Sequence, residues 1–350
     1  MEGSSTSAFD AAAFRARLHA AGLGGCLLSC HSAPSTQTLM YENRAVLPPG
    51  TVFVADRQVA GKGRAGNQWT SPPGCLMFSV LFNSKLRGEE LVGEELGVQG
   101  VRECAGPGMR GRDESKCNSR ALRSVDWTRP LTLNPQPPTD LLCPAAGQDV
   151  PFVQYVACLA VVSALQRLFS ERLGTTASPR TFPVKIKWPN DIYAVQGGRS
   201  LKIGGILCQS CNVLNHFSIV AGVGLNLDNA EPTTCVNALL AVEAEACGVG
   251  VAPVTREEVL AVFLNDFELL MEVRVGADRG RVVGGRSATE RDAPLQVLRS
   301  KTFEALAGTY QRYWMHRDQQ LSLEDPDDAV IRVRCCRAWL VDRSRPLRHA

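Results

Sequence analysis

The sequence predicts an α+β fold, in which helices pack on a mixed or antiparallel sheet. Four short apolar runs between residues 184 and 225 follow one another with only turns between them, which indicates consecutive strands. Residues 152–173 are apolar on nearly all sides and predict a buried helix, whereas residues 259–270 predict an amphipathic one. With 350 residues, the chain is long enough to bury a full core.

The first 85 residues contain one predicted helix and two predicted strands. Residues 7–21 predict a short helix that ends at Gly22 and Gly24. The apolar runs Val52–Ala55 and Cys75–Phe82 predict strands on either side of a glycine-rich loop.

Residues 102–149 differ in composition from the segments around them. This stretch holds six prolines and seven basic residues and has no sustained periodicity. Such a composition predicts a disordered or loosely held insertion.

The second half of the chain contains the run of strands and the second helix. The predicted strands are Val184–Trp188, Ile192–Val195, Lys202–Gln209 and Phe217–Leu225. Thr255 and Glu258 form a capping box ahead of the helix Val259–Leu270. Residues 273–301 are rich in glycine and arginine and predict a loop.

The C-terminal region begins with apolar residues at helical spacing, Phe303, Leu306, Tyr310 and Trp314. The final residues, 331–350, carry six arginines and one aspartate. They lack the alternation of strands and are expected to form a solvated tail.

Composition restricts the class of protein. Lys and Arg total 38 and Asp and Glu total 35, a net charge of +3, so we do not expect nucleic acid as a partner. Apolar runs shorter than the roughly 18–20 residues of a membrane span lead us to expect no membrane as a partner. The N-terminus lacks the basic and apolar regions of a secretory signal. Thirteen cysteines are scattered through apolar stretches, which indicates a reducing compartment. We therefore expect a cytoplasmic protein, or a plastid or mitochondrial one if an alternative start adds a transit peptide.

The glycine-rich loop is the first segment that carries chemistry. Residues 61–66, Gly-Lys-Gly-Arg-Ala-Gly, fit the pattern G-x-G-x-x-G, which opens a helix in dinucleotide-binding folds. Pro72 and Pro73 follow too closely for a helix of useful length. The loop therefore predicts a flexible connection between strands, whose Lys62 and Arg64 can meet a carboxylate or phosphate. A solvated basic turn is the alternative interpretation.

Three other segments carry weaker signals. In residues 187–191, Lys-Trp-Pro-Asn-Asp, a proline breaks a strand and two turn-forming residues follow. In residues 202–207, Lys-Ile-Gly-Gly-Ile-Leu, glycines within a strand indicate close approach of a ligand or backbone. Residues 222–227, Gly-Val-Gly-Leu-Asn-Leu, end a strand with an amide side chain. A structural turn, and a lysine that simply reaches solvent, remain the alternatives for the first two.

Together these segments, in this order, resemble the biotin protein ligases, or holocarboxylase synthetases. Residues 55–64, 69–79, 187–193, 202–207 and 222–227 carry the resemblance, and residues 228–237 resemble the plant and green-algal branch. The resemblance covers about residues 25–85, 150–272 and 302–325. It implies a catalytic domain of the class II synthetase-like biotin/lipoate type at residues 25–272, after an N-terminal extension at 1–24. A partial or divergent SH3-like barrel is implied at 302–350.

The resemblance also implies the activity. The family activates biotin with ATP to biotinyl-5′-AMP and transfers the biotin to one lysine of a carboxylase carrier domain. ATP with Mg²⁺ on its phosphates is the implied cofactor, and carrier domains of biotin-dependent carboxylases, such as acetyl-CoA carboxylase, are the implied partners.

The resemblance implies roles for individual residues. Lys202, Arg64 and Lys62 match catalytic positions. The biotin-binding positions are matched by Ser35, Thr36, Gln37, Gln58, Lys62, Gly63, Arg64, Lys202 and Gly205. The nucleotide-binding positions are matched by Gly61, Trp69, Lys187, Asn190, Asp191 and Asn226.

The residue types suit this chemistry independently of the resemblance. A carboxylate that attacks a phosphate brings two anions together, and Lys202, Lys62 and Arg64 reduce their repulsion. The substrate carboxylate and the acceptor amine are themselves the nucleophiles, so no protein nucleophile is needed. Lys62 stands where the family usually has arginine, which keeps the charge and loses bidentate contact.

Two other functions stay open at this point. A lipoate or octanoate protein ligase of the same superfamily also uses a single strand lysine. A degenerate relative that binds biotin or a carrier domain without turnover would suit the apparently incomplete C-terminal barrel. The Cys208-x-x-Cys211 pair is expected to be structural, because residues three apart in a strand point to opposite faces.

Overall fold

The structure is a computed structural model of the whole chain. The residues it describes are 8–85, 132–133, 142–144, 152–174, 182–213, 216–229, 231–272, 303–317, 320–324 and 330–334. The predicted insertion at 102–149 lies outside the described residues except for two short strands, and the predicted loop at 273–301 lies wholly outside them.

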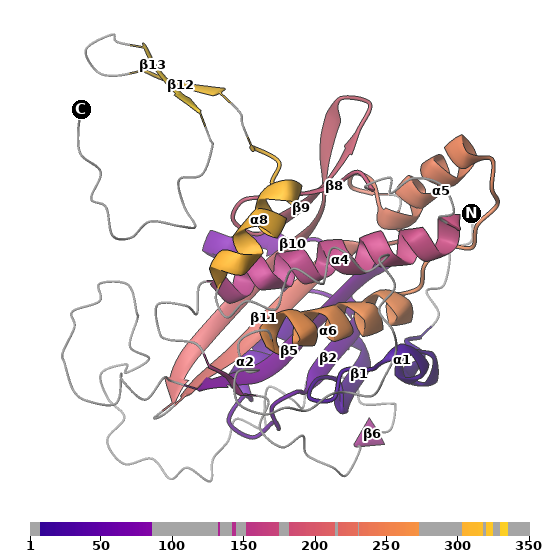
Figure 1. Cartoon of the computed structure of the whole chain (residues 1–350). Coiled ribbons are helices and arrows are strands. Elements are labelled where there is room, and N and C mark those ends of the chain that lie inside the picture. The colour runs from indigo at the N-terminus through magenta and orange to yellow at the C-terminus, as the bar shows by residue number, and fades with distance from the viewer. Residues whose placement is uncertain are drawn as a thin grey trace, which may run out of the picture.

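A nine-stranded mixed sheet forms the centre of the molecule (Figure 1). Eight strands lie in the order β6-β1-β2-β5-β11-β10-β9-β8, and β7 pairs with β5. In that order they are Thr132–Leu133, Cys26–Ala33, Val52–Gln58, Cys75–Lys85, His216–Asn226, Arg199–Val213, Asp191–Gln196 and Val184–Lys187, with β7 at Leu142–Pro144. All neighbours are antiparallel except β1 with β2 and β5 with β7. The predicted α+β fold with a mixed sheet is therefore confirmed.

The parallel pair of β1 and β2 is joined by a crossover through helix α2 (Thr36–Glu42), as parallel strands require. Ser35 begins the helix because its hydroxyl accepts a hydrogen bond from the Thr38 backbone N–H at 3.3 Å. Leu39 and Met40 of α2 are buried against the sheet in a small apolar cluster with Leu81 and Val220.

The opposite face of the sheet, which carries Val80 and Ala221, is covered by helices α4 (Val153–Leu173) and α6 (Arg256–Glu272). We call this the helix face; both helices lie across it in Figure 1. Phe263 of α6 meets Phe78 of β5 edge-on, with ring centroids 5.0 Å apart. Burial of such large rings is the main stabilising contribution here.

Helix α4 is apolar on nearly all sides because other elements surround it. The sheet lies on one side of it, and α6 and α8 contact it on others. Its length and composition would also allow it to cross a membrane, but 67% of its most apolar stretch is buried in the molecule, which is typical of a core helix.

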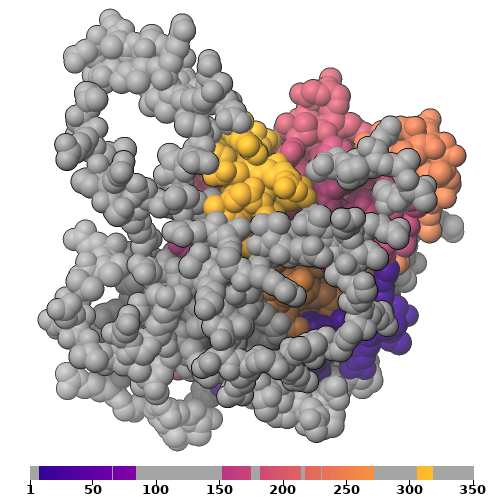
Figure 2. Space-filling model, in the orientation of Figure 1, coloured from indigo at the N-terminus to yellow at the C-terminus, as the bar shows by residue number. Residues whose placement is uncertain are grey.

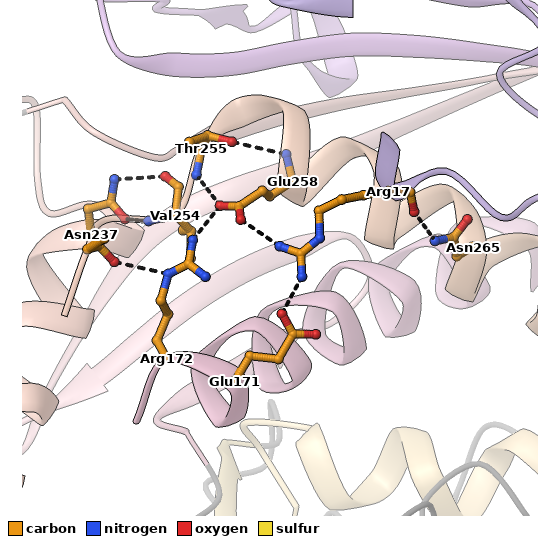
Figure 3. A network of polar contacts seen from close by, with 9 residues as sticks. Arg17, Glu171, Arg172, Asn237, Val254, Thr255, Glu258 and Asn265 are labelled. Atoms are coloured by element: carbon orange, nitrogen blue, oxygen red, sulfur yellow. Dashed lines mark hydrogen bonds and ion pairs between the residues drawn. The ribbon is translucent and has the colours of Figure 1, made fainter. Parts of the chain in front are cut away.

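The segment predicted as an N-terminal extension packs into the same core. Helix α1 (Ala11–Arg17) buries Phe14 completely. Arg17 at its end forms ion pairs with Glu171 of α4 and Glu258 of α6 (Figure 3). Arg172 also pairs with Glu258, at 2.6 Å. One carboxylate thus connects three helices that are distant in the sequence.

The predicted capping box is confirmed. The Thr255 backbone N–H donates to Glu258 Oε2 at 3.0 Å, and the Glu258 backbone N–H donates to Thr255 Oγ1 at 3.2 Å. Burial acts to raise the pKa of the Glu258 carboxyl, but the hydrogen bonds from Arg172 and Thr255 lower it overall.

Helix α8 (Phe303–Tyr313) lies at the surface (Figure 2) and contacts β8. The Met315 backbone N–H donates to the Ile186 carbonyl oxygen at 2.8 Å, and Ile186 forms a bridge with Trp314. Tyr310 of α8 packs edge-on against Tyr155 of α4, with centroids 5.4 Å apart. The helix predicted from the spacing of four apolar residues is confirmed, and it is anchored to both α4 and β8.

The C-terminal prediction needs one correction. Strand β13 (Val330–Arg334) pairs with β12 (Gln320–Glu324), although residues 331–350 were expected to lack strands. The β-branched residues Val330, Ile331 and Val333 favour a strand despite the arginines between them. A two-stranded sheet is not a barrel, and the rest of this region lies outside the described residues.

Besides β13 and the short strands β3, β4, β6 and β7, the elements not predicted from the sequence are β1, α2 and α5 (Val236–Cys247). Strands β2, β5, β8, β9, β10 and β11 and helices α4 and α6 were predicted, with ends that differ by up to four residues. Helix α1 is shorter than the predicted segment 7–21.

Candidate active site

A cavity of about 320 Å³ lies on the face of the sheet that α2 covers. We call this the cavity face, and its floor consists of Ser79 of β5, Gly222 and Gly224 of β11 and Gly205 of β10. The strand register places Gly222 beside Ser79 and Gly224 beside Gly205. Because side chains alternate along a strand, the same strands bury large residues on the helix face and leave a hollow on the other.

Two of these glycines are required by the side chains above them. A Cβ atom at Gly222 would lie 2.3 Å from Gln37 Oε1, and one at Gly224 would lie 2.6 Å from the Trp69 ring. Both distances are far below van der Waals contact. The absence of a side chain at these positions lets Gln37 and Trp69 lie directly on the sheet.

One end of the cavity is lined by uncharged hydrogen-bonding side chains. Gln58 Oε1, at the end of β2, accepts from the Thr36 backbone N–H at 2.6 Å and from the Thr36 hydroxyl at 3.1 Å. The Ser79 hydroxyl is 3.0 Å from Thr36 Oγ1 and 3.2 Å from Gln37 Oε1. Ser79, Thr36 and Gln37 are each less than 5% exposed. We call these residues, with Ser35, the polar end of the cavity.

The polar end has hydrogen-bond donors that are not used by other described residues. Both contacts of Gln58 are made through Oε1, and its amide nitrogen makes no hydrogen bond to another described residue. The Ser35 hydroxyl oxygen accepts from the Thr38 N–H, which leaves its hydrogen free to donate. A ligand with both a carbonyl oxygen and N–H groups could satisfy this end, because Gln37 Oε1 is an acceptor close to the donors.

The other end of the cavity carries positive charge. Lys202 of β10 forms an ion pair with Asp191 of β9, with 2.7 Å between Nζ and Oδ1. The Lys202 side chain is 40% exposed, so it reaches solvent, as one of the two alternatives from the sequence allowed. Its ammonium group is held in place by a carboxylate and remains accessible.

The glycine-rich loop closes one side of the cavity. Its residues form a small hairpin, β3 (Gly61–Lys62) with β4 (Gln68–Trp69), around one turn of 3₁₀-helix at Arg64–Gly66. This agrees with the prediction that no long helix begins here. Lys62, Gly63, Arg64 and Trp69 all line the cavity. The Trp69 indole N–H is buried without a hydrogen-bond partner among the described residues.

The turn between β8 and β9 meets the glycine-rich loop. The Asn190 amide nitrogen donates to the Ile206 carbonyl oxygen at 2.8 Å, and Asn190 Oδ1 accepts from Arg64 at 3.2 Å. The Trp188 indole N–H donates to the Tyr155 hydroxyl at 3.0 Å. Burial raises the pKa of Tyr155 more than this hydrogen bond lowers it, so the hydroxyl keeps its proton.

The structure brings most of the predicted site residues together. Those that line the one cavity are Ser35, Thr36, Gln37, Gln58, Lys62, Gly63, Arg64, Trp69, Asn190, Asp191, Lys202 and Gly205. They come from five strands (β2, β3, β4, β9 and β10), the start of helix α2, the glycine-rich loop and the turn before β9. Their individual roles stay predictions.

Three predicted residues do not line the cavity: Gly61, Lys187 and Asn226. Gly61 lies against the Trp69 backbone, where a Cβ would be 2.5 Å from the carbonyl oxygen. The Lys187 ammonium lies 5.3 Å from the centroid of the Tyr193 ring. The Asn226 side chain is buried and donates to the Thr234 carbonyl oxygen at 3.2 Å.

Among the residues at the site that were not singled out from the sequence are Ser79, Gln209 and Tyr155. Ser79 and Gln209 join the polar end through Gln37, and Tyr155 contacts the turn through Trp188. The only available signal was the small size of residues 79, 222 and 224 in otherwise apolar strands. Tyr155 gave no signal, because its α4 segment is apolar throughout.

The sequence matches one family model, described as the Biotin/lipoate A/B protein ligase family, over residues 29–124 and 142–226. A chloroplastic biotin–protein ligase 1 of Arabidopsis thaliana is 30% identical over 302 residues, which cover 85% of this chain and 55% of the relative. The chain therefore spans about half the length of that relative. Biotin–protein ligase 2 of Arabidopsis thaliana is 27% identical and is covered to 69%, and the Homo sapiens biotin–protein ligase is 25% identical and is covered to 34%.

Solved structures with a related arrangement include a biotin protein ligase from Aquifex aeolicus in complex with biotin and ATP. It has 18% sequence identity and a TM-score of 0.43, and the match covers 88% of this chain and 85% of that one. A biotin protein ligase from Leishmania major in complex with biotin has 16% identity and a TM-score of 0.45, covering 88% and 94%.

Proposed function

This chain belongs to the biotin/lipoate A/B protein ligase family, and from that premise we propose that it is a biotin protein ligase. In the proposed reaction, biotin and ATP give biotinyl-5′-AMP and pyrophosphate. The biotinyl group then passes to a lysine of a carboxylase carrier domain, and AMP is released.

The polar end of the cavity is the observation that supports biotin over lipoate. Biotin carries a cyclic urea, with one carbonyl oxygen and two N–H groups, whereas lipoate ends in a dithiolane without strong donors or acceptors. A dithiolane would leave the Gln58 amide and the Ser35 hydroxyl without partners and would leave Gln37 Oε1 only the Ser79 hydroxyl. A site built to hydrogen-bond its substrate discriminates strongly against an analogue that lacks those groups.

The positive end supports an activation step between two anions. The biotin carboxylate oxygen attacks the α-phosphorus of ATP, a P–O bond forms, and pyrophosphate leaves with the electron pair of the broken bond. Lys202, Arg64 and Lys62 line the same cavity and would reduce the repulsion between the two reactants and stabilise charge in the transition state. Asp191 holds the Lys202 ammonium in position.

The second step needs no protein nucleophile. The amine of the acceptor lysine attacks the acyl carbon of the adenylate, AMP leaves with the electron pair of the broken bond, and the amine loses a proton. Between the steps, the hairpin of the glycine-rich loop would shield the acyl-adenylate from water.

Magnesium enters this proposal only as the ion that ATP brings. Among the described residues, no group of three or more His, Cys, Asp or Glu side chains could hold a metal ion. Asp191 offers the oxygen ligands that Mg²⁺ prefers, but it already pairs with Lys202. In the part of the chain that the structure describes, Asp191 is thus the carboxylate of the cavity that could meet an ion bound to the ATP phosphates.

Biotin-dependent exchange of ATP with labelled pyrophosphate tests the proposal. We expect exchange that requires biotin and is not supported by lipoate or octanoate. Exchange with lipoate and none with biotin would replace the proposal with a lipoate ligase. Tight biotin binding by folded protein without exchange would identify a relative that binds without turnover.

Transfer is tested separately with a purified carrier domain. We expect one added biotinyl group by mass spectrometry and none when the acceptor lysine is replaced by arginine. The C-terminal barrel and the cytoplasmic location stay predictions from the sequence.

A further inference from the structure

We propose that Gln209 is a positioning residue that favours the cyclic urea of biotin by holding the Gln37 amide in one orientation together with the Val220 carbonyl oxygen. The inference rests on the proposed function and extends it to a residue outside the cavity. Gln209 lies on β10 directly beside Val220 of β11.

The orientation of the Gln37 amide follows from its partners. Its Nε2 is 3.2 Å from the Val220 carbonyl oxygen and 3.0 Å from Gln209 Oε1. A backbone carbonyl can only accept a hydrogen bond, so the atom that faces it must be the amide nitrogen. Val220 and Gln209 thus occupy both hydrogens of that nitrogen, and Oε1 is turned toward Ser79.

This orientation decides what the polar end offers to a ligand. With Oε1 inward, Gln37 presents an acceptor near the donors of Gln58 and Ser35, a combination that matches the N–H and carbonyl groups of a cyclic urea. A Gln37 amide turned the other way would present only donors. The missing side chain at Gly222 gives Oε1 its place, since a Cβ there would be 2.3 Å away.

Gln209 itself does not touch the ligand space. It is absent from the cavity lining and its side chain is exposed, so it acts only through Gln37. Exposure also means that substitution should hardly affect the free energy of unfolding. An effect on biotin binding would therefore not be a consequence of misfolding.

Two substitutions at Gln209 distinguish the effect of its hydrogen-bond acceptor from the effect of its side-chain size. Gln209→Met has a similar length and no acceptor of comparable strength, whereas Gln209→Glu keeps an oxygen acceptor for Gln37 Nε2. We expect Gln209→Met to raise the KM for biotin about three- to tenfold, the range of one hydrogen bond, with kcat and the KM for ATP unchanged. Gln209→Glu should stay within about twofold of the wild type.

Gln196→Met is the matched control. Gln196 ends β9 beside Arg199, in the hairpin outside the cavity, and its substitution should leave both KM values unchanged. In a Gln37→Leu background, Gln209→Met should have no further effect on the KM for biotin, because the residue through which it acts is gone.

Three results would overturn the inference: an unchanged KM for biotin in Gln209→Met, an equal rise in Gln209→Glu, or an undiminished effect in the Gln37→Leu background. Calorimetric titration of biotin without ATP repeats the comparison if the wild type shows no exchange. Differences in biotin affinity would then uphold the inference while the proposed activity fails, and a wild type that binds no biotin would overturn both.

Discussion

The two faces of the central sheet are made by the same strands and have opposite properties. On the helix face, residues such as Phe78, Ala221 and Val223 pack against α4 and α6 and are almost wholly buried. On the cavity face, Ser79, Gly222 and Gly224 leave space that polar side chains from α2 and the glycine-rich loop approach. Because successive side chains point to opposite faces of the sheet, one strand can stabilise the core with half of its residues and form the cavity with the other half.

Removal of a large aromatic ring from the helix face should have the largest effect of the four changes, and the quantity affected should be the free energy of unfolding. Phe263 contacts Phe78 and Phe267, and Phe263→Ala should lower the free energy of unfolding by about 3–5 kcal/mol. Chemical denaturation measures the loss. Activity per folded molecule should be retained, and a lost biotin-dependent exchange in the folded fraction would show that the two faces are not separable.

Removal of the central cation from the cavity face should strongly lower activity and leave the free energy of unfolding unchanged. We expect Lys202→Ala to lower kcat for biotin-dependent exchange about 10²- to 10³-fold, as for loss of one group that stabilises transition-state charge. Arg199→Ala, at the exposed start of β10 and outside the cavity, is the control and should behave as the wild type. A normal rate in Lys202→Ala would remove Lys202 from the proposed mechanism.

A methyl group added to the cavity floor tests whether the space above Gly222 is needed for biotin binding. In Gly222→Ala, the new Cβ would displace Gln37 Oε1, and we expect the KM for biotin to rise about tenfold, within the usual 1–3 kcal/mol of overpacking. Gly250→Ala is the control, because nothing lies within 4 Å of a Cβ there. Unchanged biotin kinetics in Gly222→Ala would mean that the polar end does not bind the substrate.

A matched pair of Tyr→Phe variants gives the smallest expected effect and tests how the helix face supports the cavity. Tyr155→Phe removes the acceptor for the Trp188 indole N–H, beside the turn that holds Asn190. We expect the KM for ATP to rise about threefold, the effect of one modest hydrogen bond, with the KM for biotin unchanged.

Tyr310→Phe is the counterpart, because the Tyr310 hydroxyl is buried without a hydrogen-bond partner among the described residues. Steady-state kinetics of both variants should show an effect only in Tyr155→Phe. Equal effects would mean that ring packing between α4 and α8, rather than the hydrogen bond, supports the turn.

Much of the fold could be predicted because its signals are local. The apolar length of 153–173 is sufficient to indicate α4, and the Thr255–Glu258 pair is sufficient to locate the start of α6. Helix α2 was missed because it is only seven residues long, too short for a periodic pattern to be evident. Strand β13 was missed because its arginines obscure the β-branched residues between them.

In the candidate site, too, only the residues with a local signal could be predicted. Residue types alone indicated the glycine-rich loop, the lysine of 202–207 and the turn at 187–191, because glycine, proline and charge act locally on the backbone or on a ligand. The sequence by itself therefore determined which chemistry the chain can carry. Residue types indicated the cations on short turns and strands, and the family resemblance indicated the uncharged amides and hydroxyls near residue 36.

Only the tertiary structure decided which of these residues meet. Strand order places β10 and β11 between β5 and β9, so Gln37, Ser79 and Gln209, far apart in the sequence, share hydrogen bonds. The same packing buries Asn226 away from the cavity and pairs Lys202 with Asp191. Hydrogen bonds and ion pairs depend on distances of about 3 Å, and such distances between remote segments are set by the packing of the sheet, which no local pattern contains.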